Sequence, residues 1–149
     1  MKTPLKTDYP SFAAKWMIFA VALLLVNLIS MPLFAQQRVP WVAPKTAQDT
    51  KNPVSADKSA LTEGKTLYTT NCAPCHGDKG RGDGPAAQAL TPKPADHSSA
   101  AVQSETDGSL FWKVSEGRKP MPAYKQVLTD KQRWELVNYI RTLAKGTKK

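Results

Sequence analysis

The longest uninterrupted apolar stretch of the chain runs from Trp16 to Val26, and apolar residues remain frequent up to Ala35. The flank before it carries more lysine than acid. A positive flank, an apolar core and a small final residue are typical of a secretory signal, here cleaved after Ala35. Because residues 16–35 also reach the roughly 20 residues that span a bilayer, an uncleaved N-terminal anchor is the alternative. Both interpretations predict that the rest of the chain lies outside the cytoplasm.

Apolar residues at helical spacing predict a helix from Ala60 to about Asn71, capped by Ser59. The apolar face of this helix consists of Leu61, Gly64, Leu67 and Tyr68. A glycine costs a helix on the order of 1 kcal/mol relative to alanine. Its place on the apolar face therefore predicts that another helix approaches closely there.

The second strongly patterned segment lies near the C-terminus. Thr129 and Gln132 have the spacing of a capping box, which marks the start of a helix, and Gly146 is placed to stop it. Its apolar stripe is formed by Leu136, Tyr139, Ile140, Leu143 and Ala144. Such a stripe needs a packing partner, and we expect it to cross the face that contains Gly64 and Tyr68.

A shorter helix is predicted from Gly108 to Glu116, with Thr106 or Asp107 at its start and Gly117 at its end. Residues 91–105 have the composition of a loop, and no alternating strand pattern occurs between residues 57 and 149. The sequence therefore predicts an all-α domain of three or four short helices separated by long loops.

Residues 36–56 contain three prolines among mostly polar residues, which predicts an extended linker. Val39, Trp41 and Val42 are the apolar exceptions, and they either tether the linker to the domain or are exposed. The predicted organisation is a signal peptide or anchor over residues 1–35, a Pro-rich linker over 36–56 and a folded domain over 57–149.

The chemistry of the chain centres on Cys72-Ala-Pro-Cys75-His76, which contains its only two cysteines. A Cys-x-x-Cys pair followed by His is the attachment signature of c-type haem. The thiols of Cys72 and Cys75 would form thioethers with the haem, and His76 would supply the proximal nitrogen ligand. A thioredoxin-like redox pair or half of a zinc site are the alternatives for the cysteine pair alone.

Met121 is the candidate for the sixth ligand, because it is the only methionine after the motif and lies between Pro120 and Pro122. The two prolines exclude a helix and stiffen the loop that would bring the thioether to the iron. His/Met ligation raises the reduction potential and closes the iron to small ligands, which favours electron transfer. His97 could instead give a bis-His haem, but its polar surroundings predict a solvent-facing loop residue. Large apolar residues available for the haem wall are Trp112, Tyr124 and Trp134.

Four glycines follow His76 between residues 77 and 84, which predicts a tight, irregular loop close to the haem. A ligating histidine usually donates its other ring N–H to a carbonyl oxygen. The carbonyl of Pro85, at the end of this loop, is the predicted acceptor.

The net charge and the predicted export limit the kinds of partner that the chain could bind. The net charge of +9 fits nucleic acid, an anionic membrane or an acidic protein, and the predicted export argues against nucleic acid. Cationic residues that flank the two haem loops are candidates for a rim that docks an acidic redox partner. They are Lys79, Arg81, Lys113, Arg118, Lys119 and Lys125.

These features together resemble the monohaem class I c-type cytochromes over about residues 57–145. The resemblance rests on the haem motif after a first helix, on the Gly64/Tyr68 and Leu136/Tyr139 faces, on Gly84-Pro85 and on Met121-Pro-Ala-Tyr124. It implies a class I cytochrome c fold around one covalent haem c. The Gly-rich loop departs from the family pattern and is similar to that of bacterial haem subunits appended to larger membrane complexes.

We therefore expect an exported electron carrier, not an enzyme, that acts between redox proteins of a respiratory chain. It would be periplasmic, or held at the outer face of the cytoplasmic membrane by residues 16–35. One alternative is a haem subunit of a membrane-bound oxidoreductase complex. A gas-binding or peroxidase-like haem protein, with an open sixth site, is another.

Overall fold

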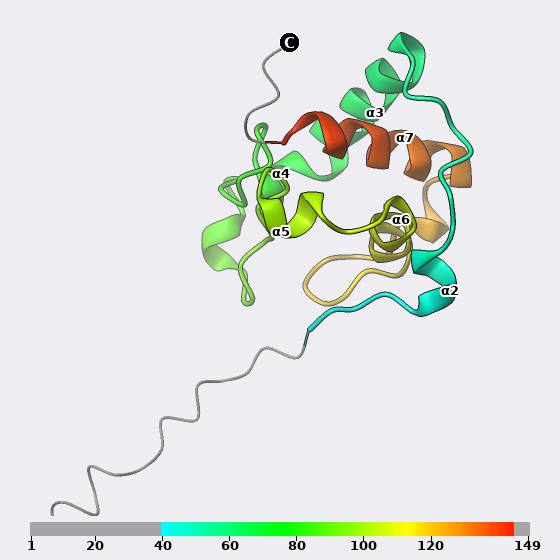
Figure 1. Ribbon diagram of the computed structural model, residues 1–149. Helices are drawn as coiled ribbons and strands as arrows, with labels where there is room; N and C mark the ends of the chain where they lie inside the picture. Colours follow the sequence, from blue (N-terminus) through cyan, green and yellow to red (C-terminus); the bar gives the residue numbers. More distant parts are fainter. Residues whose placement is uncertain (1–39, 145–149) are drawn as a thin grey trace, which may run out of the picture. The chain divides into compact units, whose positions relative to one another are not determined.

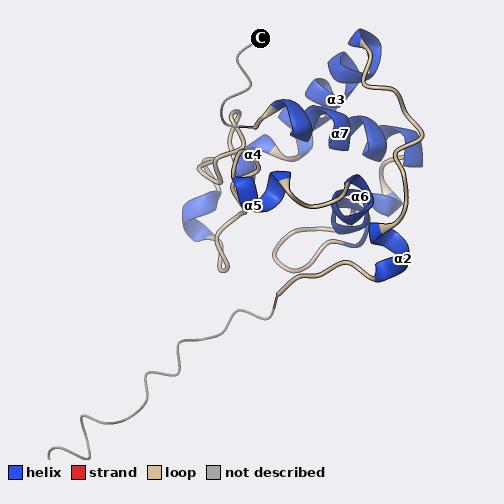
Figure 2. Ribbon diagram, viewed as in Figure 1, coloured by secondary structure: helices blue, strands red, loops and turns tan. Residues whose placement is uncertain are grey.

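The computed structural model describes residues 40–144, which fold as helices joined by long loops (Figures 1 and 2). No β-strand occurs among these residues, so the predicted all-α class is confirmed. The α-helices are α2 (Lys45–Gln48), α3 (Lys58–Asn71), α4 (Ala73–His76), α5 (Ala100–Gln103), α6 (Asp107–Glu116) and α7 (Asp130–Thr142). Two 3-10 turns, η1 (Ala87–Ala89) and η2 (Tyr124–Gln126), lie in the loops.

Two predictions fall on residues outside the described range. The signal or anchor over residues 1–35 and the helix stop at Gly146 both lie there. Within residues 40–144, no helix has the length and apolar character needed to cross a membrane.

The helix starts follow from local capping chemistry. The Asp57 carboxylate accepts a hydrogen bond from the Ala60 amide at 2.9 Å, so α3 begins at Lys58 and Ser59 lies inside the helix, not at its cap. Thr106 caps α6 as predicted. Thr129 and Gln132 form the predicted capping box of α7.

Helices α3 and α7 pack against each other through Gly64, as their apolar patterns predict (Figure 1). A Cβ atom at Gly64 would lie only 2.2 Å from the backbone oxygen of Glu135 and 3.1 Å from the Cβ of Tyr139. Beside this contact, the rings of Tyr68 and Tyr139 pack with their centroids 5.1 Å apart. The glycine is therefore explained by the close approach of the two backbones.

Helix α6 completes the core. Leu110 and Val114 are buried against the α3–α7 pair. Phe111 stacks on Trp134 of α7, with centroids 3.9 Å apart and planes inclined by 12°. These contacts place one side of α6 in the core, and Leu110 and Val114 also line a cavity.

Residues 41–56 of the predicted linker belong to the folded unit, which begins at Trp41. The ring of Trp41 lies 6.3 Å from that of Trp112, and α2 packs on α6 where Gly108 leaves room for the backbone of Ala47. Farther along, Asn138 of α7 donates to the carbonyl of Val54 at 3.0 Å. The prolines of this segment prevent a long helix but not packing, and the predicted boundary at residue 57 is therefore wrong. We call residues 41–50 the strap.

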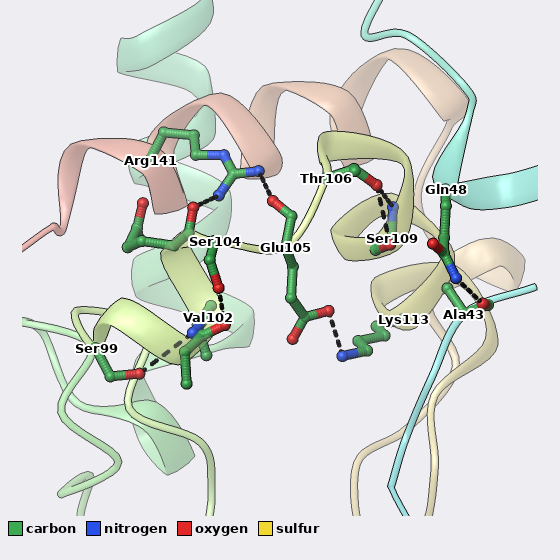
Figure 3. A network of polar contacts seen from close by, with 12 residues as sticks. Ala43, Gln48, Ser99, Val102, Ser104, Glu105, Thr106, Ser109, Lys113 and Arg141 are labelled. Atoms are coloured by element: carbon green, nitrogen blue, oxygen red, sulfur yellow. Dashed lines mark hydrogen bonds and ion pairs between the residues drawn. The ribbon is translucent and has the colours of Figure 1, made fainter. Parts of the chain in front are cut away.

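A polar cluster fixes the segment between α5 and α6 (Figure 3). The Arg141 guanidinium donates to the carbonyl oxygens of Gln103 and Glu105 and to the carboxylate of Asp107. The Glu105 carboxylate in turn pairs with Lys113. This cluster holds the start of α6 to α7, which sets the position of the α6 wall.

We predict that Gly64→Ala destabilises the protein although alanine is the better helix former. A Cβ 2.2 Å from the Glu135 oxygen forces α3 and α7 apart. The overpacking should lower the free energy of unfolding by about 1–3 kcal/mol, measured by urea unfolding followed by circular dichroism. The control Lys65→Ala, at an exposed position of the same helix, should change it by less than about 0.5 kcal/mol. Equal stability of the Gly64→Ala variant and the unmodified protein would contradict the close crossing.

We predict that Gly108→Ala loosens the strap. Its Cβ would lie 1.9 Å from the carbonyl oxygen of Ala47, so α2 must move away from α6. Tryptic cleavage after Lys45 and Lys51 should become roughly 5- to 30-fold faster, as expected for about 1–2 kcal/mol of local destabilisation. Mass spectrometry of the early fragments measures this rate. The exposed variant Ser104→Ala serves as the control, and an unchanged rate in Gly108→Ala would show that the strap does not depend on this contact.

Candidate functional site

Cys72, Cys75, His76 and Met121 all line one cavity of about 190 Å³. The first three come from the end of α3 and from α4, and Met121 comes from the loop between α6 and η2. The wall is mostly apolar and also includes Trp41, Leu90, Pro92, Pro94, Val102, Leu110, Val114, Tyr124 and Ile140. The structure thus brings together the predicted attachment motif and the predicted distal methionine, which are far apart in sequence.

The motif adopts one helical turn. The amides of Cys75 and His76 both donate to the carbonyl of Cys72, at 3.1 and 2.8 Å. Gly77, with φ of 77°, ends the turn. This turn brings both cysteines and His76 to the cavity wall, and Cys72 and His76 are largely buried there.

The ring of His76 is oriented by a backbone carbonyl. Its Nδ1 lies 2.9 Å from the oxygen of Ala95, which places the proton on Nδ1 and leaves the Nε2 lone pair available to a metal. Burial lowers the pKa of His76, and the Ala95 bond opposes this effect only in part, so the ring is neutral at pH 7.

The predicted acceptor, Pro85, is wrong. Pro85 is exposed and does not line the cavity. The backbone around it folds back on α4, with the amide of Ala86 bound to the carbonyl of Pro74 at 2.9 Å. The later segment that contains Pro94 and Ala95 passes beside His76 instead.

The Gly-rich loop wraps closely around α4. The amide of Gly82 donates to the carbonyl of His76 at 2.8 Å, and that of Gly84 donates to Cys75 at 3.2 Å. At Gly82, with φ of 73°, a Cβ would lie 2.5 Å from the carbonyl oxygen of Pro94. The loop therefore holds the Pro94–Ala95 backbone against the proximal side of the cavity.

His97 is not the solvent-facing residue that its polar sequence surroundings predict. Its ring stacks on that of His76, with centroids 4.0 Å apart and planes inclined by 18°. Its Nδ1 lies 3.1 Å from the hydroxyl oxygen of Tyr68. Burial lowers the pKa of His97 to about 3, and the positive charge that His76 would carry when protonated contributes to this shift. The ring of His97 is therefore also neutral at pH 7.

Met121 lies in a tight turn. The amides of Arg118 and Met121 each donate to the other's carbonyl, at 3.0 and 2.9 Å. Gly117 precedes the turn with φ of 63°, and a Cβ there would lie 2.5 Å from the carbonyl of Pro122. These contacts close the loop on itself and hold the half-buried methionine at the cavity.

A single hydrogen bond ties the methionine loop to the attachment helix. The hydroxyl of Tyr124 donates to the carbonyl of Asn71, the residue before Cys72, at 2.7 Å. Burial, and then the nearby cysteines, raise the pKa of Tyr124 to about 12, so its hydroxyl keeps the proton. The two loops that carry the candidate ligands are thereby linked.

Only one of the three predicted wall aromatics lines the cavity. Tyr124 does, whereas Trp134 is buried in the core against Phe111 and Trp112 lies behind Trp41. Trp41 takes the place in the wall, with the guanidinium of Arg118 4.8 Å from its ring centroid. In the sequence, the sign of this role was a tryptophan within a mostly polar segment.

The cysteine chemistry differs from that of a redox dithiol. Both thiols are free, and burial raises the pKa of Cys72 to about 12, with a further contribution from Cys75. A reactive dithiol needs the opposite shift, since the thiolate is the nucleophile. Within residues 40–144, no three His, Cys, Asp or Glu side chains gather to hold a metal ion, so the zinc alternative finds no complete ligand set there.

The side chains at this cavity fit a haem. Two thiols and a neutral imidazole lie on one helical turn, a thioether lies on the facing loop, and the rest of the wall is mostly apolar. These are the ligand and attachment groups of c-type haem, and an apolar surround suits the porphyrin.

Comparison with known proteins supports the same conclusion. The family model described as cytochrome c matches residues 61–144. A solved structure, the Kuenenia stuttgartiensis reducing HAO-like protein complex, is similar with a TM-score of 0.56 and 25% sequence identity. That match covers 74% of this chain and 53% of the other, so it extends over about half of the other chain. The comparison with curated proteins gives no significant match.

The family match includes most of α3, the Cys72-to-His76 turn, the methionine loop and α7. These are the same elements that build the cavity and the helix crossing. The chain belongs to the cytochrome c family.

Proposed function

We propose that this protein carries one covalently attached haem c with His76 and Met121 as its axial ligands, and that it relays single electrons between redox partners. The observation that carries the proposal is the convergence of Cys72, Cys75, His76 and Met121 on one mostly apolar cavity. No other described residues combine these donor types in one place.

Each residue has a separate task in this proposal. The haem, when bound, supplies a one-electron ferric/ferrous couple. Cys72 and Cys75 would hold it through thioethers, and His76 would present its Nε2 because Ala95 occupies Nδ1. Met121 would bind the iron through its thioether, from a loop that its own hydrogen bonds close. With both ligands bound, no site would remain for oxygen or peroxide, which favours electron transfer over a gas-binding or peroxidase role.

We also propose a location for the protein. We place it outside the cytoplasm, in the periplasm or at the outer face of the cytoplasmic membrane, because residues 1–35 have the pattern of an export signal or anchor. There it would act as an electron carrier of a respiratory chain and not as an enzyme by itself.

A second candidate is a haem subunit within a larger oxidoreductase. What supports this candidate is that the similar solved chain belongs to a reducing HAO-like protein complex, and this protein covers 53% of that chain. Co-purification with membrane partners would favour the subunit, whereas recovery alone from the exported soluble fraction would favour the carrier.

We predict that Met121→Ala removes the absorption band of iron–thioether ligation from the ferric protein and opens the iron to added imidazole or cyanide. The reduction potential should fall by roughly a tenth of a volt or more, given the range of about 0.8 V that axial ligands control. Spectroelectrochemistry measures both effects. Lys119→Ala, an exposed change in the same loop, should leave band and potential in place. Retention of the band in Met121→Ala would contradict the assignment.

The predicted cationic rim is partly neutralised within the protein itself. Lys113 pairs with Glu105, and Lys125 pairs with Glu116 at 2.6 Å. Lys79, Arg81 and Lys119 are exposed. Lys119 lies two residues before Met121 in the loop at the cavity. A substitution at Lys119 therefore tests directly whether an acidic partner docks beside the cavity.

We predict that Lys119→Glu slows electron transfer to an acidic redox partner about 2- to 10-fold at low ionic strength, with convergence to the unmodified rate at high salt. Stopped-flow kinetics over a series of salt concentrations measures this. Lys65→Glu, an equal charge change at an exposed position of α3 outside the cavity wall, should have a smaller effect. A rate that does not depend on salt would exclude the cationic docking surface.

A further inference from the structure

We propose that His97 is a positioning residue for the proximal ligand, whose flat ring stacks on His76 and fixes the rotation of that imidazole about the iron–nitrogen bond. The inference rests on the proposed role of His76 as an axial ligand. It also explains the contacts that Gly80 of the Gly-rich loop and the hydroxyl of Tyr68 make with His97.

The geometry of the pair is that of a face-to-face stack. The centroids lie 4.0 Å apart and the planes are inclined by only 18°. A metal shared by two imidazoles lies in the plane of both rings, so the rings meet edge to edge across it. The stacked arrangement therefore makes His97 the neighbour of His76 and not a second ligand of the same iron.

His97 is itself held from three directions. Its ring Nδ1 lies 3.1 Å from the Tyr68 hydroxyl, and its backbone amide donates to the carbonyl of Gly80 at 2.6 Å. The side-chain amide of Gln103 donates to its carbonyl at 2.7 Å. A side chain fixed in this way presents a rigid flat surface to its neighbour.

Gly80 is the residue that admits this arrangement. Its φ is 70°, and a Cβ there would lie 3.0 Å from the Cβ of His97 and 3.3 Å from the hydroxyl oxygen of Tyr68. The loop can approach His97 this closely only without a side chain at position 80. The fold of this loop thus places His97 beside the proximal ligand.

The stack and the carbonyl constrain different motions of His76. The Nδ1–Ala95 hydrogen bond holds one edge of the ring at 2.9 Å, but a ring can still rock about that contact. A flat partner on its face blocks this rocking. The orientation of the imidazole plane determines how its π orbitals overlap with the iron d orbitals, so it is visible in the magnetic anisotropy of ferric haem.

The test compares two replacements of similar bulk, His97→Phe and His97→Leu, in the full-length haem-loaded protein. Phenylalanine keeps a flat face for stacking, whereas leucine does not. Low-temperature electron paramagnetic resonance of the ferric protein reports the orientation and spread of the axial ligand. We expect a shift of the largest g value and broader lines in His97→Leu, and a smaller change in His97→Phe. Lys79→Ala, an exposed change in the Gly-rich loop, is the control.

Circular dichroism and the iron–thioether band show whether each variant keeps its fold and its distal ligand. Unchanged spectra for folded His97→Leu, or equal shifts for both variants, would overturn the positioning role. Should the leucine variant fail to fold, a shifted largest g value and broader lines in the folded phenylalanine variant would overturn the role, and an unmodified spectrum would support it. Failure of the proposed function is distinguishable, because the unmodified protein would then lack the spectrum of histidine-ligated haem altogether.

Discussion

The close contact of α3 and α7 at Gly64 is the constraint on which the rest of the structure depends. It fixes the direction in which α3 ends, and hence where Cys72 and the following turn enter the cavity. Tyr68, one turn after Gly64, extends the effect. Its ring packs on Tyr139 of α7, while its hydroxyl lies 3.1 Å from His97 and 3.3 Å from the carbonyl of Gly77. Burial raises the pKa of Tyr68, so the hydroxyl stays protonated and can serve both contacts.

Hydrogen bonds between segments that are distant in sequence hold the walls of the cavity together. Tyr124 links the methionine loop to the end of α3, and His76 links α4 to the Pro94–Ala95 backbone. Arg141 clamps the segment before α6. A small domain has little apolar interior with which to hold its loops, so such long-range polar contacts and a bound haem take over part of that task.

The sequence correctly predicted the features that depend on the spacing and type of residues. The caps of α6 and α7, the crossing at Gly64 and the pairing of the Cys72–His76 turn with Met121 all follow from spacing and residue type. The sequence did not reveal which carbonyl meets His76, because loop routes depend on contacts made far along the chain. Pro85 is nearer in sequence, but Ala95 is nearer in space. His97 was misjudged for the same reason, since polar neighbours in sequence say little about a ring that packs on distant residues. For Trp41, the tether to the domain was one of two interpretations left open, and it is the one that the structure shows.

The position of Trp41 limits how far an anchored haem domain could extend from the membrane, and this bears on the choice between carrier and subunit. With a linker of residues 36–56, an uncleaved anchor would allow the haem domain to move about 70 Å from the membrane, at roughly 3.3–3.6 Å per extended residue. Because the folded unit begins at Trp41, the chain between residue 35 and the domain spans at most about 20 Å. An anchored protein would thus be confined near the membrane surface, where it could reach membrane-bound partners but not soluble partners farther away. Cleavage after Ala35 would remove that restriction, so the fate of the N-terminal segment and the kind of partner are one question and not two.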